Sequence, residues 1–279
     1  TPIGTPPNLI FMQVYKEISG EQISFTRWMS WGIPVVVLLV PLLAWWLTRD
    51  LPKTLKIELP EPGPWRSGEK RVLMLFCATA FAWMTRLEPF GGWQSLLGWP
   101  HANDASIAFI AVVTLFIVKD GDGAPLISWR QASDIPWGVL LLFAGGISLA
   151  TAFVASGLSE AVGNALTSFA NYPLFALVLM LALLVTFLTE MTSNTATTAL
   201  LMPILAATAL STGVKLELLM VPAVLSASCA FMLPVATAPN AVIFGTGRVR
   251  IGEMVRRGLF ANLLGVLIIT AVVLLVLGY

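Results

Sequence analysis

The chain has 279 residues, of which 57% are hydrophobic and only 11% charged, and its formal net charge is +1. Soluble domains carry about 25% charged residues, so this composition indicates an integral membrane protein. The near-zero net charge argues against nucleic-acid binding. Long apolar runs separated by short charged loops predict an all-α polytopic membrane protein, whereas a β-barrel would show short alternating segments.

The first part of the chain alternates apolar runs with polar loops. A Pro-rich opening and a short half-helix are expected in residues 1–28. Four membrane spans should follow, at 31–47, 72–85, 105–118 and 136–156, with polar loops at 48–71 and 119–135. Apolar residues at helical spacing over 158–171 predict an amphipathic helix that lies at the membrane interface.

A polar segment, Thr-Glu-Met-Thr-Ser-Asn-Thr at residues 189–195, interrupts an apolar region over 173–210. Polar side chains at membrane depth are unfavourable unless they face protein, water or an ion, so this segment is the main candidate for a functional site. Each apolar arm beside it has about 15 to 17 residues, which is marginal for crossing a hydrocarbon core of about 30 Å. We therefore predict a re-entrant helical hairpin with the polar segment at its tip. Hydrogen bonding between helices is the alternative interpretation of these hydroxyls.

An uncharged motif with two prolines, Pro-Val-Ala-Thr-Ala-Pro-Asn at residues 234–240, ends the next apolar run. Proline removes a backbone donor, so the region 216–247 is predicted to be one broken helix, followed by a last membrane helix at 259–279. Residues 2–8 match the motif at Pro, Thr, Pro and Asn with a constant offset of 232. Recurrent breaks are typical of inverted-repeat secondary transporters. We expect one complete repeat preceded by the tail of an earlier one, most of which is missing.

Lysine and arginine are unevenly divided between the loops. Alternating spans place loops 48–71, 119–135 and 245–258 on one side, and these loops hold six, two and four of the 16 basic residues. The positive-inside rule makes this side cytoplasmic. The hairpin is then expected to enter from outside and the C-terminus to lie outside, with the protein in a bacterial inner membrane.

The two motifs together, Ser-Asn-Thr at 193–195 and the segment 234–240, closely resemble those of the divalent anion/sodium symporter family, which carries C4-dicarboxylates, citrate and sulfate. The resemblance covers essentially the whole chain, as the C-terminal portion of the family fold. It implies a homodimer of protomers in which a transport domain moves like an elevator against a scaffold domain. On this pattern the transport domain comprises 1–28 and 172–258, and the scaffold comprises 29–157.

The resemblance also implies roles for individual residues. Substrate contacts fall on Ser193, Asn194, Thr195, Thr237, Pro239, Thr5 and Pro6. Sodium ligands fall on Thr189, Thr192, Asn194 and Ala236, with Thr192 and Ala236 offering backbone carbonyls, and Gly4 helps to form another sodium site. Sodium ions are thus the expected cofactors, and no organic cofactor is expected.

The local chemistry suits an anion that binds together with sodium. Residues 137–214 and 216–247 contain no Lys, Arg or His, so no basic side chain nearby in the sequence neutralises an anion. Helix N-termini after Thr195 and after Asn240 would each present about half a positive charge. Sodium held by oxygen ligands would add the remaining positive charge, and this would couple the binding of sodium to the binding of the anion. Glu190 is interpreted as an organiser of the sodium site, a proton carrier, or a structural carboxylate that accepts backbone N–H bonds.

These observations predict sodium-coupled symport of a small divalent anion, with a C4-dicarboxylate such as succinate as the leading candidate. A sodium-independent dicarboxylate exchanger and a non-transporting membrane sensor or structural subunit are the alternatives. Succinate, malate, citrate and sulfate all remain possible substrates. An enzyme is not expected, because the sequence shows no nucleophile–base set and no cofactor motif. The expected partners are the anion, sodium, the lipid bilayer, a second copy of the chain and the missing N-terminal half.

Overall fold

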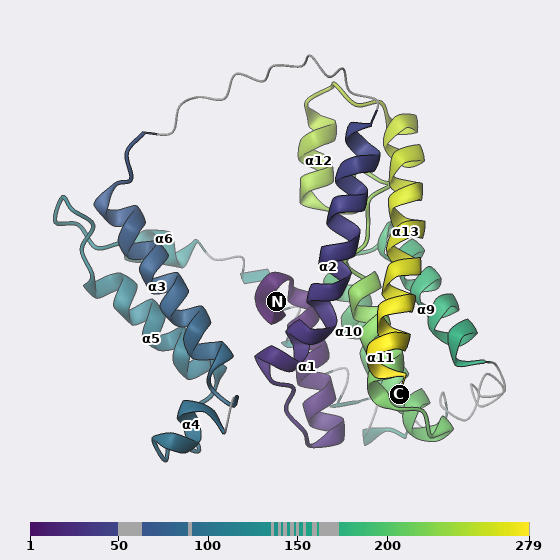
Figure 1. Ribbon diagram of the computed structural model, residues 1–279, viewed down its shortest axis with the longest axis horizontal. Helices are drawn as coiled ribbons and strands as arrows, with labels where there is room; N and C mark the ends of the chain where they lie inside the picture. The colour runs from purple at the N-terminus through teal and green to yellow at the C-terminus, as the bar shows by residue number, and fades with distance from the viewer. Residues whose placement is uncertain are drawn as a thin grey trace. The chain divides into compact units, whose positions relative to one another are not determined.

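The computed structural model describes residues 1–49, 63–88, 91–134 and 173–278, together with isolated positions between 137 and 161. This part of the chain is helical and contains no strand (Figure 1). Three of its helices are long and apolar enough to cross a membrane: α2 (Phe25–Thr48), α10 (Asn194–Thr212) and α13 (Ile251–Leu277). The prediction of an all-α membrane protein agrees with this architecture. The expected interfacial helix at 158–171 and most of the expected span at 136–156 lie outside the described residues.

The chain divides into two compact units. Besides α10, α13 and nearly all of α2, the first unit contains η1 (Pro2–Gly4), α1 (Pro6–Ser19), α9 (Leu174–Thr189), α11 (Leu216–Ser226) and α12 (Ala238–Gly245). The second unit contains α3 (Ser67–Met84), α4 (Gly92–Leu96), α5 (Asp104–Ile117) and α6 (Trp129–Ser133). Helix α2 therefore groups by its contacts with α1 and α9 to α13. The expected division into a scaffold of 29–157 and a transport domain stays a prediction.

The core of the first unit lies where α9, α11 and α13 pack against one another and α10 packs against α1, α9 and α11. Small residues line these contacts: Ala182, Ala206 and Ala223 are all fully buried. Small side chains let helix backbones approach closely, which is how membrane helices associate. In contrast, Val36, Val37 and Val40 of α2 are more than half exposed. These apolar side chains suit contact with lipid.

The helix boundaries correct several predictions. Helix α9 has 16 residues, as expected for a hairpin arm, but α10 has 19 and is longer than expected. Helix α11 ends at Ser226, although the apolar run continues to Leu233. The last helix begins at Ile251 rather than at residue 259. Its first turn contains Glu253, which suits the positive helix N-terminus and pairs with Arg257 at 3.2 Å, so the basic segment continues the helix.

The second unit is built on the pair α3 and α5, which pack against each other. Arg86 follows α3 and is 2% exposed. Its Nε donates to Asp104 Oδ1 at 2.7 Å, and its Nη1 donates to Gln94 Oε1 at 2.9 Å. A buried charge needs such partners. Arg86 therefore fixes the loop that carries α4, a helix that the sequence analysis did not predict.

Candidate ion and anion site

The tip of the helical hairpin lies between α9 and α10. Helix α9 ends at Thr189, and α10 begins at Asn194 after the extended N-cap residue Ser193. Thr189 and Glu190 are 0% and 3% exposed, whereas Met191 is 81% exposed. The side chains of Thr189 and Glu190 are therefore buried in the first unit, whereas Met191, in the middle of the turn, is exposed.

Three oxygen atoms meet at Thr189. Its Oγ1 lies 2.5 Å from Asn194 Oδ1 and 3.0 Å from the carbonyl oxygen of Ala227. A hydroxyl has one proton, so it can donate to only one of these acceptors. Oxygen atoms grouped in this way suit a hard cation such as sodium. The sequence analysis missed Ala227, whose carbonyl is available because α11 has just ended.

Two more buried hydroxyls flank this group in the sequence. Thr186 precedes Thr189 by one helical turn, and Ser226 is adjacent to Ala227. Both residues are fully buried, and neither hydroxyl has a hydrogen-bond partner among the described residues. Buried polar groups are normally paired. These orphaned hydroxyls add to the oxygen-rich character of the region between α9 and α11.

The other threonines near the tip bond within the hairpin. Thr192 Oγ1 donates to the carbonyl of Leu188 at 2.8 Å and lies 2.6 Å from Thr197 Oγ1. Thr198 Oγ1 donates to the carbonyl of Asn194 at 2.8 Å. The Thr192 hydroxyl is thus used in hydrogen bonds within the hairpin. Its backbone carbonyl is the group that was expected to bind sodium.

Glu190 joins the hairpin tip to the second helix break. Its carboxylate accepts the backbone N–H groups of Met232 and Leu233, each at 2.9 Å, and the side-chain amide of Asn262 at 2.7 Å. An unwound segment leaves backbone donors without helical partners, and a buried carboxylate needs several donors. The interpretation of Glu190 as a structural carboxylate is therefore confirmed.

The second break spans residues 227–237, and residues of α12 and α13 contact it in addition to Glu190. Asn240 Nδ2 donates to the carbonyls of Ala230 and Leu233 at 2.9 and 3.0 Å. Asn262 Oδ1 accepts from the N–H of Phe231 at 3.2 Å. Gly258 of α13 lies so close that a Cβ there would be 2.2 Å from the Phe231 carbonyl oxygen. The break begins earlier than the prolines suggested because these side chains, and not proline alone, satisfy its backbone.

The N-terminal break has a similar local geometry. Thr5 is extended between η1 and α1, with φ −155° and ψ 146°, and Thr237 precedes α12 with φ −142° and ψ 154°. Asn8 Nδ2 donates to the carbonyl of Thr1 at 3.0 Å. Helix α1 packs against both α10 and α11. At both predicted breaks, the residue directly before the next helix thus has an extended backbone.

The structure brings together only some of the predicted site residues. Thr189 and Asn194 are in direct contact. The segment with Ala236, Thr237 and Pro239 follows the Glu190-bound residues. Among the residues that the structure describes, no hydrogen bond joins Gly4, Thr5, Pro6, Ala236, Thr237 or Pro239 to the tip. Gly4, Pro6, Ser193 and Pro239 are exposed, and Thr5, Asn194, Thr195, Ala236 and Thr237 are half-buried.

Three helix N-termini lie at the predicted site residues. Helices α1, α10 and α12 begin directly after Thr5, Ser193 and Thr237. The first N–H groups of a helix lack intrahelical partners and attract anions. Within the described residues, no cluster of His, Cys, Asp and Glu could hold a metal ion. The oxygen atoms that meet at Thr189 come from a hydroxyl, an amide and a backbone carbonyl.

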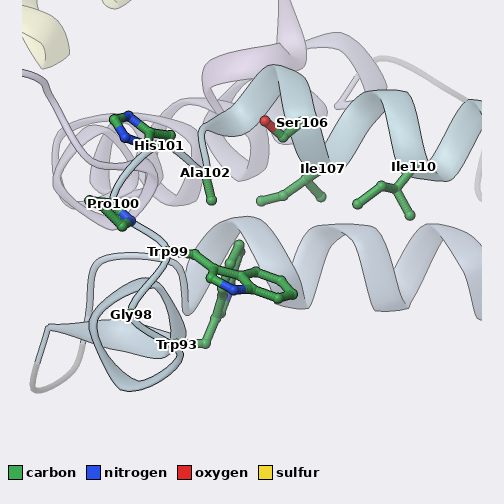
Figure 2. A pocket seen from close by; sticks show the side chains of 9 residues that line it. All are labelled: Trp93, Gly98, Trp99, Pro100, His101, Ala102, Ser106, Ile107 and Ile110. Atoms are coloured by element: carbon green, nitrogen blue, oxygen red, sulfur yellow. The ribbon is translucent and has the colours of Figure 1, made fainter.

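A separate cavity of about 370 Å³ lies in the second unit. Figure 2 shows Ile107 and Ile110 on the side of α5 that faces the Trp99 ring, with Trp93 behind it. His101 also lines this cavity. Its walls are largely apolar and carry none of the predicted site residues, so we do not assign the anion to it.

Apolar helices with a polar hairpin tip bonded to an unwound helix have the construction of a secondary membrane transporter. The comparison with known families agrees. Residues 2–278 match the sodium:sulfate symporter transmembrane region, and the chain belongs to this family of sodium-coupled anion transporters, as its motifs had indicated.

The chain is also similar to curated proteins that are named as sodium-dependent transporters. The chain is 38% identical to the sodium-dependent dicarboxylate transporter SdcS of Staphylococcus saprophyticus and 37% identical to the SdcS protein of Staphylococcus aureus. Each match covers 98% of this chain and 55% of the relative. The chain thus spans about half the length of these relatives, which are transporters and not enzymes.

Proposed function

We propose that this chain forms part of a symporter that couples sodium to the movement of a small divalent anion. The observation that carries the proposal is the meeting of Thr189 Oγ1, Asn194 Oδ1 and the Ala227 carbonyl within 3.0 Å. Two of these three residues are the sodium ligands expected from the hairpin motif. In this proposal the Thr192 and Ala236 carbonyls complete the set, and Gly4 contributes to another sodium site.

The anion in this proposal binds beside the sodium ion. Ser193, Asn194 and Thr195 would contact it at the start of α10, and Thr237 and Pro239 would do so at the start of α12. Thr5 and Pro6 would supply the contacts from the first break. Helix N-termini and the sodium ion then provide the positive charge that a dianion needs.

A C4-dicarboxylate such as succinate is the anion that we propose. Two relatives are named as sodium-dependent dicarboxylate transporters. Because sodium and the anion neutralise each other at adjacent sites, each should increase the affinity for the other by the same factor. We further propose a homodimer, an elevator movement of the transport domain, an inverted repeat and an external C-terminus.

Thermal unfolding of the purified protein tests the sodium site without any transport assay. A ligand that binds only the folded state raises the melting temperature. Sodium chloride should therefore stabilise the protein relative to choline chloride at equal ionic strength. Thr189→Val keeps the shape of the side chain, removes the hydroxyl, and should abolish this difference.

Thr208→Val is the matched control. Thr208 is a buried threonine of α10, and among the described residues its hydroxyl bonds only to the carbonyl of Ile204, at 2.8 Å. This variant should retain the sodium-dependent shift. Equal shifts in the wild type and Thr189→Val would remove Thr189 from the site.

A further inference from the structure

A second polar cluster in the first unit joins three helices. Glu217, in the first turn of α11, accepts two hydrogen bonds at the same oxygen, Oε1. Tyr15 Oη of α1 donates at 2.7 Å, and Arg27 Nη2 of α2 donates at 2.9 Å. Tyr15 and Glu217 are 202 residues apart in the sequence. One carboxylate oxygen thus ties α1 and α2 to α11.

The surroundings strengthen these contacts. Tyr15 is 3% exposed, and the Glu217 side chain is 14% exposed. Burial and the hydrogen bond to Glu217 raise the pKa of Tyr15 to about 12, so its phenol remains a donor at physiological pH. Arg27 also lies over the Trp31 ring, with its guanidinium carbon 5.5 Å from the ring centre. Charge-assisted hydrogen bonds of this kind are about twice as strong as neutral ones.

The cluster lies at the same distance along the chain from each helix break. Ten residues separate Tyr15 from Thr5, and ten separate Glu217 from Ala227. At about 1.5 Å per residue, each stretch is about 15 Å long. Helices α1 and α11 pack against each other. Because helices move as nearly rigid bodies, a tie at one end of the pair influences how the ends at the breaks lie.

We infer that Glu217 is a positioning residue that, by holding Tyr15 and Arg27, sets the spacing of α1 and α11 and thereby the geometry of both helix breaks. The inference rests on the proposed function, because the anion is placed at those breaks. Glu217 contacts neither the anion nor sodium in this scheme. Its effect reaches the site through the two helices.

Two small substitutions test this role in the whole transporter that contains the chain. Glu217→Gln keeps the side-chain shape but removes the charge, and Tyr15→Phe removes only the hydroxyl. Each should raise the KM for succinate about tenfold at fixed sodium, which corresponds to the loss of one strong hydrogen bond. Vmax should stay within about twofold, because ground-state binding is what changes. The double variant should be little worse than either single variant.

Glu21→Gln is the control for loss of a carboxylate near Arg27. Glu21 lies 3.8 Å from Arg27 and has an exposed side chain, so its contribution is screened by solvent. This variant should keep the KM of the wild type. Hydrogen exchange of the α1 amides adds a measurement that needs no transport, and exchange should be faster in Glu217→Gln.

The outcomes separate this inference from the proposed function. Faster exchange with an unchanged KM would reduce the cluster to a purely structural role and overturn the inference. Additive effects of Tyr15→Phe and Glu217→Gln on KM would overturn it as well, since the two groups would then act separately. Lack of any dicarboxylate uptake by the wild type would instead contradict the proposed function.

Discussion

Asn8 and Asn240 make the same contact in two helix breaks that are 232 residues apart. Asn8 Nδ2 donates to the carbonyl of Thr1 at 3.0 Å, and Asn240 Nδ2 donates to the carbonyl of Leu233, also at 3.0 Å. Each asparagine thus reaches back seven residues and closes the segment before its helix. The match between residues 2–8 and 234–240 in the sequence is thus accompanied by a matching side-chain contact.

Asn240→Ala should destabilise the protein more than Asn8→Ala. Asn240 satisfies two carbonyls, whereas the Asn8 side chain bonds to one. An unsatisfied buried polar group costs about 1 to 3 kcal/mol. Thermal unfolding in detergent measures the difference. Identical melting temperatures for both variants and the wild type would show that these asparagines do not hold the breaks.

Glu190→Ala should be the most destabilising change at the hairpin tip. It removes the acceptor of Met232 N–H, Leu233 N–H and the Asn262 amide. We expect a loss of about 3 kcal/mol or more in the free energy of unfolding. Glu190→Gln should be milder, because it keeps one oxygen acceptor.

Glu253→Gln is a suitable control for the loss of a carboxylate. Glu253 pairs with Arg257 at 3.2 Å on the surface of α13, and its side chain is 46% exposed. Such surface pairs contribute little to stability. If Glu190→Ala and Glu253→Gln had the same melting temperature, the hydrogen bonds between the tip and the break would not contribute to stability.

Gly258→Ala should disturb the second break. A Cβ at Gly258 would lie 2.2 Å from the Phe231 carbonyl oxygen and 2.6 Å from the Met232 Cα, both backbone atoms that cannot rotate away. Gly252→Ala, in the same helix, has nothing within 4 Å and provides the control. We expect a lower melting temperature and weaker sodium stabilisation for Gly258→Ala only. Equal behaviour of the two variants would refute the close packing of α13 on the break.

Asn194→Ala should weaken sodium activation of transport. Asn194 Oδ1 is one of the oxygens at Thr189, 2.5 Å from its hydroxyl. Loss of a single strong ligand should raise the sodium concentration for half-maximal uptake about tenfold or more. Uptake measured against sodium concentration provides the test. Normal transport by Asn194→Ala would remove the hairpin tip from the ion site.

The sequence located the turn between α9 and α10, because polar residues inside a long apolar region are rare. The family resemblance assigned Thr189 and Asn194 to one ion site, and the structure shows that their side chains are in contact. The sequence failed at Ser226, where α11 ends, because residues 227–233 are as apolar as the helix before them. The break is fixed by Glu190, Asn240 and Asn262, which come from distant parts of the chain. Local sequence propensity cannot predict such tertiary contacts.

The polar cluster of Tyr15, Arg27 and Glu217 was not predicted from the sequence either. Tyr15, Arg27 and Glu217 are unremarkable polar residues near the ends of apolar helices, and no local motif connects them. Only the packing of α1 on α11 brings them to one oxygen atom.

Uptake of radiolabelled succinate into proteoliposomes tests the central proposal most directly. The whole transporter that contains this chain is reconstituted, and uptake is compared in external sodium chloride and in choline chloride of equal ionic strength. Our account predicts accumulation that requires sodium and is reduced in Thr189→Val but not in Thr208→Val. Equal uptake of succinate in sodium and in choline would contradict sodium coupling.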